Sequence, residues 1–213
     1  MLRLQLIKTD RLIITLKRFL SSHLLNEAVK MTISIIASGQ SAENWTPEGL
    51  SIGCNDAGKW GNLLDAILVC NRPEQFSKER MEIIKNTKVE KFYSNKSNWS
   101  QWFPKWEKVP LVTWYGSYNP KQVYSSNTSP FIAISLAAKL GAKKIVLWGV
   151  DFVNHKTYSA GNPQTQREVK AYLELIEAMK PHGVSVYLGA KGTAFDDHIQ
   201  LDLKPICTPM GLL

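Results

Sequence analysis

The sequence predicts an α/β protein: a Rossmann-like, mostly parallel sheet with helices on both faces. Short apolar runs typical of buried strands alternate with longer amphipathic runs typical of helices. The connections between these runs are short, as they are in sheets built from strand–helix–strand units. At 213 residues, with 44% hydrophobic residues, the chain is long and apolar enough for one domain with a sizeable core.

Three apolar runs predict the first strands. Ile33–Ala37 precedes a Ser-Gly turn, and Leu50–Cys54 and Ala66–Cys70 follow as the second and third strands. Residues 56–65 lie between the latter two and contain two glycines, which predicts a brief helix or turn. The segment Gln75–Lys85 is rich in Glu and Lys and predicts a surface helix.

The second half of the chain repeats this alternation. Strands are expected at Lys88–Tyr93, Pro110–Trp114, Ile145–Gly149 and Val184–Leu188, and helices at Asn127–Leu140 and Gln166–Met179. Gly141 follows the first of these helices and Pro181 the second, and both residue types end helices. Helices therefore connect the strands on the C-terminal side of the sheet.

Positive charge is unevenly distributed. The net charge is +8, and residues 1–30 carry half of it, with six basic residues against two acidic ones. A basic chain can bind nucleic acid, an anionic membrane surface or a phosphorylated small ligand. Because half of the excess lies outside the expected core, we expect no nucleic acid and favour a nucleotide or nucleotide-sugar ligand.

Residues 1–30 are predicted to be a basic amphipathic extension of a single nucleotide-binding domain at 31–213. Leu12, Ile13 and Leu16 begin an apolar stripe at helical spacing. Three interpretations remain: a helix packed on the domain, a helix in weak contact with a membrane surface, or an extension upstream of a natural start at Met31.

Cysteine usage favours a reducing compartment. Cys54, Cys70 and Cys207 are odd in number and have no metal-ligand spacing. No apolar run reaches the roughly 20 residues that span a bilayer. We expect a cytoplasmic protein, membrane-peripheral if residues 1–30 bind lipid, and neither a cofactor nor an obligatory metal. The sequence does not predict the oligomeric state.

Polar residues gather at the predicted carboxyl ends of strands, where ligands collect in parallel sheets. The polar residues at these ends are Ser38, Ser41, Asn55, Asp56, Asn71 and Asp151, with Gly39 and Gln40 in the same turn as the two serines. A scatter unrelated to function would not follow the strand ends so consistently. The sequence therefore predicts a ligand site along this edge of the sheet.

Each of these features also has a structural explanation. Ser38–Ser41 can hold phosphate through backbone N–H groups and hydroxyls, yet an ordinary strand-to-helix turn also favours Ser and Gly. Asn55 and Asn71 can bind sugar hydroxyls or a base edge, or simply form turns. Ser129 is a candidate N-cap, and a capped helix still offers N–H groups to an anion. Asp151 can cap the next segment or bind a hydroxyl.

Proton transfer has three candidates, His155, Tyr158 and His198, although a lone loop histidine is more often incidental. Residues 92–126 hold many aromatics with interspersed lysines. Filling a core is the default interpretation of such a segment, and a lid over the crevice is the functional alternative.

These motifs resemble the bacterial sialyltransferases of glycosyltransferase family 42, together with motility-accessory glycosyltransferases and archaeal hydroxymethylpterin pyrophosphokinases. Ala37–Ser41 is similar to the family's first loop, and Asn55 and Asn71 to its strand-end asparagines. Thr128–Pro130 is similar to its T-S-G helix start, and Gly149–Phe152 to its G-I-D-F strand end. The resemblance spans roughly 33–188.

The resemblance implies a cytidine-nucleotide donor site lined by Ser38, Gly39, Ser41, Asn55, Asn71, Ser129, Gly149, Asp151 and Phe152, with Tyr158 on the donor phosphate. Pro130, Val153 and Gln40 depart from the pattern. The family's catalytic histidine precedes the last long helix, where this chain has Gly161–Gln164. His155 in the adjacent loop is the substitute we consider.

We therefore expect a metal-independent, glycosyltransferase-like protein that binds a cytidine-type nucleotide sugar. Whether it is an enzyme stays open at this point. One alternative is diphosphate transfer to a small hydroxymethyl acceptor. The other is a nucleotide-binding protein that lost the catalytic histidine and has no turnover.

Overall fold

The structure is a computed structural model, and it describes residues 31–47, 49–153, 159 and 161–202. The predicted extension 1–30 and the candidate residues His155 and Tyr158 lie outside the described residues. Within the described part of the chain, no helix has the length and apolar character needed to cross a bilayer.

In the part of the chain that the structure describes, seven strands form one sheet in which every neighbouring pair is parallel. Their order is β5-β4-β3-β2-β1-β8-β9. The bounds are β1 Thr32–Ile36, β2 Leu50–Cys54, β3 Ala66–Leu68, β4 Lys91–Ser94, β5 Glu107–Lys108, β8 Lys144–Trp148 and β9 Ser185–Leu188. The predicted α/β class with a parallel sheet is confirmed.

The strand order reverses at β1. The chain builds outward from β1 to β5, then returns to place β8 on the other side of β1. Ile33 of β1 is paired with Leu50 of β2 on one side and with Ile145 of β8 on the other. Such a reversal leaves a crevice beyond the carboxyl ends of β1 and β8, because the connections that follow these two strands run in opposite directions.

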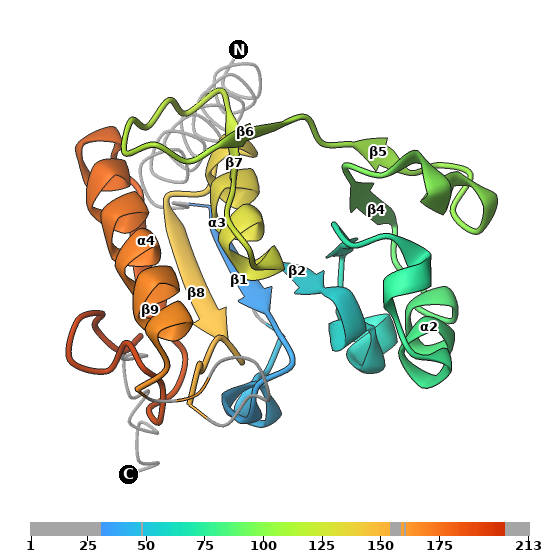
Figure 1. Ribbon diagram of the computed structural model, residues 1–213, viewed down its shortest axis with the longest axis horizontal. Coiled ribbons are helices and arrows are strands. Elements are labelled where there is room, and N and C mark those ends of the chain that lie inside the picture. Colours follow the sequence, from blue (N-terminus) through green and yellow to red (C-terminus); the bar gives the residue numbers. More distant parts are fainter. Residues whose placement is uncertain (1–30, 48, 154–158, 160, 203–213) are drawn as a thin grey trace, which may run out of the picture. The chain divides into compact units, whose positions relative to one another are not determined.

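Among the described residues, three α-helices accompany the sheet (Figure 1): α2 Lys78–Lys85, α3 Ser129–Lys139 and α4 Pro163–Met179. Helix α3 lies against β1, β2 and β8, and nine of its eleven residues are buried. Helix α4 is amphipathic and is capped by Asn162, whose side chain accepts a hydrogen bond from Gln164 N–H. The two longer helices therefore have different environments: α3 is central, and α4 keeps a solvent face.

Short 3₁₀ turns lie in several of the connections between strands and helices. They are η1 Gln40–Asn44, η2 Asn55–Leu63, η3 Pro73–Gln75, η4 Ser97–Gln101 and η5 Lys180–His182. The segment predicted as a brief helix or turn is η2. The predicted surface helix Gln75–Lys85 starts later than expected, at Lys78, because Ser77 caps it and residues 73–75 form η3.

The aromatic segment 92–126 contains more structure than the sequence predicted. Phe92 and Trp99 are buried in a core cluster with Ile67, Val69 and Ile84. The predicted strand Pro110–Trp114 is β6, Leu111–Thr113, and it pairs with an unpredicted strand β7, Val123–Ser125, in a separate two-stranded sheet. Phe92 and Trp99 thus fill a core, as the default interpretation expected, whereas Tyr115 of the same segment is exposed, and a lid function stays a prediction.

Candidate functional site

A cavity of about 1010 Å³ lies beyond the carboxyl ends of β1, β2, β3 and β8. This is the crevice expected where the strand order reverses, and its volume suits a ligand the size of a nucleotide. The sequence-predicted residues that line it are Ser38, Gly39, Gln40, Ser41, Asn55, Asn71, Ser129, Gly149, Asp151 and Phe152. The structure therefore gathers residues from five separate segments around one space.

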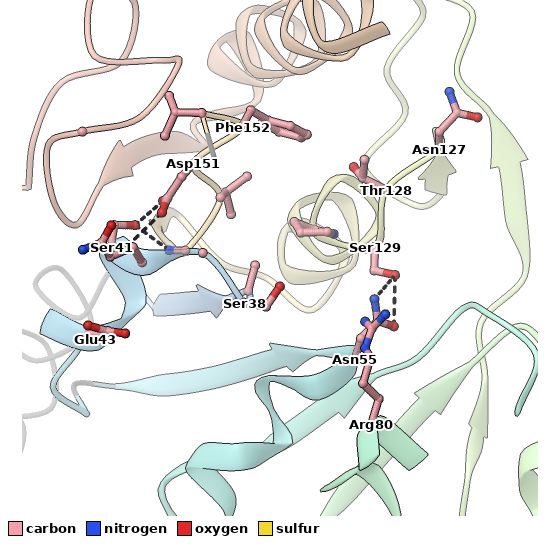
Figure 2. A pocket seen from close by; sticks show the side chains of 18 of the residues that line it. Ser38, Ser41, Glu43, Asn55, Arg80, Asn127, Thr128, Ser129, Asp151 and Phe152 are labelled. Carbon is pink, nitrogen blue, oxygen red and sulfur yellow. Dashed lines mark hydrogen bonds between the residues drawn. The ribbon is translucent and has the colours of Figure 1, made fainter. Parts of the chain in front are cut away.

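Ser41 and Asp151 hold the ends of β1 and β8 together. Ser41 N–H donates to Asp151 Oδ2 at 2.9 Å, and the Ser41 hydroxyl donates to Asp151 Oδ1. Gly149 N–H in turn donates to Ser41 Oγ at 2.7 Å. The Ser41 hydroxyl thus donates one hydrogen bond and accepts another within the protein. Ser41 and Asp151 position the two loops, as Figure 2 shows.

Gly39 is required by this close approach. A Cβ at Gly39 would lie 2.5 Å from Asp151 Oδ2 and 2.5 Å from the Gly149 carbonyl oxygen, well inside van der Waals contact. Gly39 N–H also donates to that carbonyl at 2.9 Å. The Ser-Gly turn therefore allows the loop after β1 to pack closely against the loop after β8. The Ser38 and Gln40 side chains are exposed and stay available to a ligand.

Asn55 and Ser129 meet on the opposite side of the cavity. Asn55 Nδ2 donates to Ser129 Oγ at 3.2 Å, which joins the end of β2 to the start of α3. Asn55 has φ +54°, and Phe152, which also lines the cavity, has φ +56°. They are the two non-glycine residues with positive φ among the described residues. Such backbone strain concentrates at functional sites, where the surrounding structure holds it in place.

Helix α3 begins differently from the prediction. The N-cap residue is Thr128, and Ser129 is the first helical residue, so the prediction that Ser129 caps the helix is wrong. Thr128 makes no capping hydrogen bond, because its hydroxyl contacts the buried Tyr172 hydroxyl at 2.6 Å. The first N–H groups of α3 consequently have no side-chain cap at the cavity wall, and the positive end of the helix faces that space.

Buried aromatic rings pack behind the cavity wall that the loop after β8 forms. The Phe152 ring packs edge-on against Tyr172 and Phe195, with centroids 5.5 and 5.7 Å away. Burial raises the pKa of the Tyr172 hydroxyl well above its usual range, so it stays neutral and acts as a hydrogen-bonding group for Thr128. Phe152 and Tyr172 therefore fix the loop after β8 and the start of α3 relative to each other.

Asn71 lines the cavity from the end of β3, and its carbonyl accepts a hydrogen bond from Trp99 Nε1 at 2.9 Å. The buried indole thereby anchors the Asn71 backbone, and its side chain is exposed. Cys54, directly before Asn55, is buried, and burial raises the pKa of its thiol well above the ordinary value. Cys54 is thus a neutral apolar residue, as the sequence indicated.

Asp56 does not line the cavity among the described residues. Its carboxylate instead accepts from Arg80 Nη2 of α2 at 2.9 Å. Arg80 itself lines the cavity and was not identified from the sequence. The other lining residues that the sequence analysis missed are Glu43, Asn44, Gln75, Phe76, Asn127, Lys191 and Gly192. The i, i+4 spacing of Phe76 and Arg80 was the available signal, but it lay in a segment interpreted as a plain surface helix.

Comparison with known proteins shows which solved structures share this fold. No protein-family model and no curated protein matches the chain. Among solved structures, it is similar to the sialyltransferase CstII from Campylobacter jejuni in complex with cytidine-5'-monophosphate, at 15% identity and a TM-score of 0.48 over 80% of this chain and 85% of that one. The CstII complex with CMP-3FNeuAc gives 12% identity and the same TM-score, with 80% and 86% covered.

The chain is also similar to the MAf glycosyltransferase from Magnetospirillum magneticum AMB-1. The TM-score is 0.51 at 11% identity, over 86% of this chain. The matched region is 34% of that glycosyltransferase, so the chain spans about a third of its length. This similarity shows a shared fold, and it confirms at the level of fold the resemblance that the sequence motifs indicated.

Proposed function

We propose that this domain binds a cytidine-type nucleotide sugar in the switch-point cavity and transfers the sugar without a metal ion. The observation that carries the proposal is the convergence of hydrogen-bonding side chains from four strand ends and one helix start on a single cavity. Convergent polar groups in one large cavity are the usual sign of a small-molecule site. The choice of cytidine rests on the sequence resemblance of the lining residues.

The proposed binding roles depend on the groups that each residue keeps free. Asn71 offers a carboxamide that both donates and accepts, which suits a base edge or a sugar hydroxyl. The N–H groups at the start of α3 suit the donor phosphate. Ser38 and Gln40 are exposed on the loop after β1 and suit the same phosphate. Ser41 and Asp151 would act by holding that loop against β8.

The chemical step is assigned to residues outside the described part of the chain. In the proposal, His155 takes the proton from the acceptor hydroxyl and Tyr158 hydrogen-bonds the departing phosphate. General base catalysis of this kind contributes about 10²–10⁴-fold to rate. The bond that breaks joins the sugar to the phosphate oxygen of the donor, and the bond that forms joins the same sugar carbon to the acceptor oxygen.

Two measurements on the full chain test the proposal. Cytidine monophosphate should raise the melting temperature more than uridine or adenosine monophosphate, because a ligand bound only by the native state stabilises it. Cytidine-linked sugar donors should be hydrolysed or transferred equally well with and without EDTA. If no nucleotide changes the melting temperature and no donor is consumed, the proposal is wrong.

Substitution of His155 separates catalysis from binding. His155→Ala should lower turnover about 100-fold and leave the stabilisation by cytidine monophosphate unchanged. His198→Ala is the matched control, since His198 is exposed and does not line the cavity. Nucleotide stabilisation without turnover in the wild type would indicate a binding protein, and magnesium-dependent consumption of ATP would indicate diphosphate transfer.

A further inference from the structure

Arg80 brings a guanidinium group to the cavity from helix α2. Its Nη2 donates to Asp56 Oδ1 at 2.9 Å, and its Cζ lies 5.0 Å from the centroid of the Phe76 ring. A carboxylate on one side and a ring face on the other hold the planar group in orientation, which reduces the entropy it loses on taking a further partner. The side chain is still 42% exposed, so a ligand can reach it.

The guanidinium has donors that the protein does not use. An arginine side chain carries five N–H donors, and Asp56 is the acceptor for one of them. Arg80 Nε is buried and has no hydrogen-bond partner. The Nε–H is therefore enclosed by the protein, and the terminal N–H donors that Asp56 leaves free are the ones that a ligand can reach.

Arg80 is linked through Asp56 to a residue of unusual backbone conformation in the cavity wall. Asp56 follows Asn55, the residue with φ +54°, and Asn55 donates to Ser129 at the start of α3. The turn at Asn55 therefore also fixes the position of the Asp56 carboxylate, which orients Arg80. Figure 2 shows Arg80 and Asn55 on one side of the cavity and the Ser41–Asp151 pair on the other.

We propose that Arg80 is the anion-binding residue of the cavity and that Asp56 is its positioning residue. Arg80 pairs through the terminal N–H donors that Asp56 leaves free with oxygens of an anionic group on the ligand, because a guanidinium forms strong charge-assisted hydrogen bonds with a phosphate or a carboxylate. This deepens the proposed function, on which it rests for the nucleotide. The anion is either the donor phosphate or a carboxylate on the transferred sugar.

Variants at Arg80 should fold. The Asp56–Arg80 pair is partly exposed, and such pairs contribute only about 0–1 kcal/mol to stability. Arg80→Met removes the charge and keeps a long chain against Phe76, and Arg80→Lys keeps the charge without the planar fork. Lys85→Met is the matched control, because Lys85 lies on the same helix, carries the same charge and does not line the cavity.

Titration calorimetry on the full chain would compare cytidine, cytidine monophosphate and a cytidine monophosphate sugar that carries a carboxylate. If the anion is the phosphate, Arg80→Met weakens cytidine monophosphate tenfold or more and leaves cytidine unchanged. If it is the sugar carboxylate, only the third ligand weakens by that factor. Arg80→Lys should be intermediate and Lys85→Met unchanged. The proposal is overturned if Arg80→Met binds all three ligands with wild-type affinity. It is also overturned if Lys85→Met loses as much affinity as Arg80→Met.

A second experiment without nucleotide distinguishes a failure of the Arg80 proposal from a failure of the proposed function. Inorganic phosphate and acetate, each against chloride at equal ionic strength, should raise the melting temperature of the wild type and of Lys85→Met. For at least one of the two anions the rise should be lost in Arg80→Met. If cytidine compounds do not bind but this difference persists, the nucleotide assignment is wrong and Arg80 remains an anion site. If neither anion discriminates the variants, Arg80 has no such role.

Discussion

At the scale of single residues, the cavity has two kinds of polar side chain. Ser41 and Asp151 are buried and hydrogen-bond each other through two donors, so they fix the loops after β1 and β8. Asn71 and Arg80 line the cavity with side chains that are exposed wholly or in part. The sequence identified Ser41 and Asp151 as site residues because they follow strands, but it could not distinguish a residue that binds a ligand from one that holds a loop. That distinction depends on which partner each side chain meets.

The Ser41–Asp151 pair should be energetically coupled. Ser41→Ala should lower the free energy of unfolding by about 1–3 kcal/mol, since it leaves the Gly149 N–H without its acceptor and removes a donor from Asp151. In urea unfolding, the combination of Ser41→Ala with Asp151→Asn should show about 0.5–3 kcal/mol of coupling. Ser38→Ala, on an exposed neighbour, should change stability by less than about 0.5 kcal/mol. Strictly additive effects of the pair would argue against the interlocked loops.

At the scale of elements, the apolar runs predicted the five longer strands and both long helices nearly to their ends, since burial imposes a clear pattern. The predicted helix Gln166–Met179 begins three residues earlier, at Pro163, because Asn162 caps it and proline suits its first position. Strands β5 and β7 escaped prediction. They have two and three residues, too few for a periodic pattern, and only their pairing partners define them.

The cap of α4 offers a test at this scale. Asn162→Ala should lower the free energy of unfolding by about 0.5–2 kcal/mol, because the Gln164 N–H loses its side-chain acceptor. Asn162→Asp retains an acceptor at the helix start and should be close to the wild type. Chemical denaturation monitored by circular dichroism measures both. Equal stability of the alanine and asparagine forms would show that this cap contributes nothing.

At the scale of the whole molecule, the reversal of strand order at β1 determines where the site lies. The sequence predicted that polar strand ends would converge, because the carboxyl ends of parallel strands share one edge. It could not predict the strand order, and therefore missed that Phe76, after η3, and Arg80, on α2, would line the same cavity. Contacts between α2 and η2 are long-range consequences of the fold, with no local pattern to predict them.

The basic extension is a separate proposal for the whole chain. Residues 1–30 carry +4 of the net charge of +8, so the full chain should associate weakly with anionic vesicles at low salt and dissociate as salt screens the attraction. A chain that begins at Met31 should not associate. Vesicle co-sedimentation across a salt series measures this. Identical partitioning of the two chains would exclude a membrane contact through these residues.

The most direct measurement of the central claim is a crystal structure of the full chain grown with cytidine monophosphate. The nucleotide should lie in the cavity between the Ser41–Asp151 pair and Asn71, with its phosphate near the start of α3 or Arg80. Density for the nucleotide at another surface, such as the groove between Trp114 and α4, would contradict the account. So would crystals without bound nucleotide at millimolar concentrations.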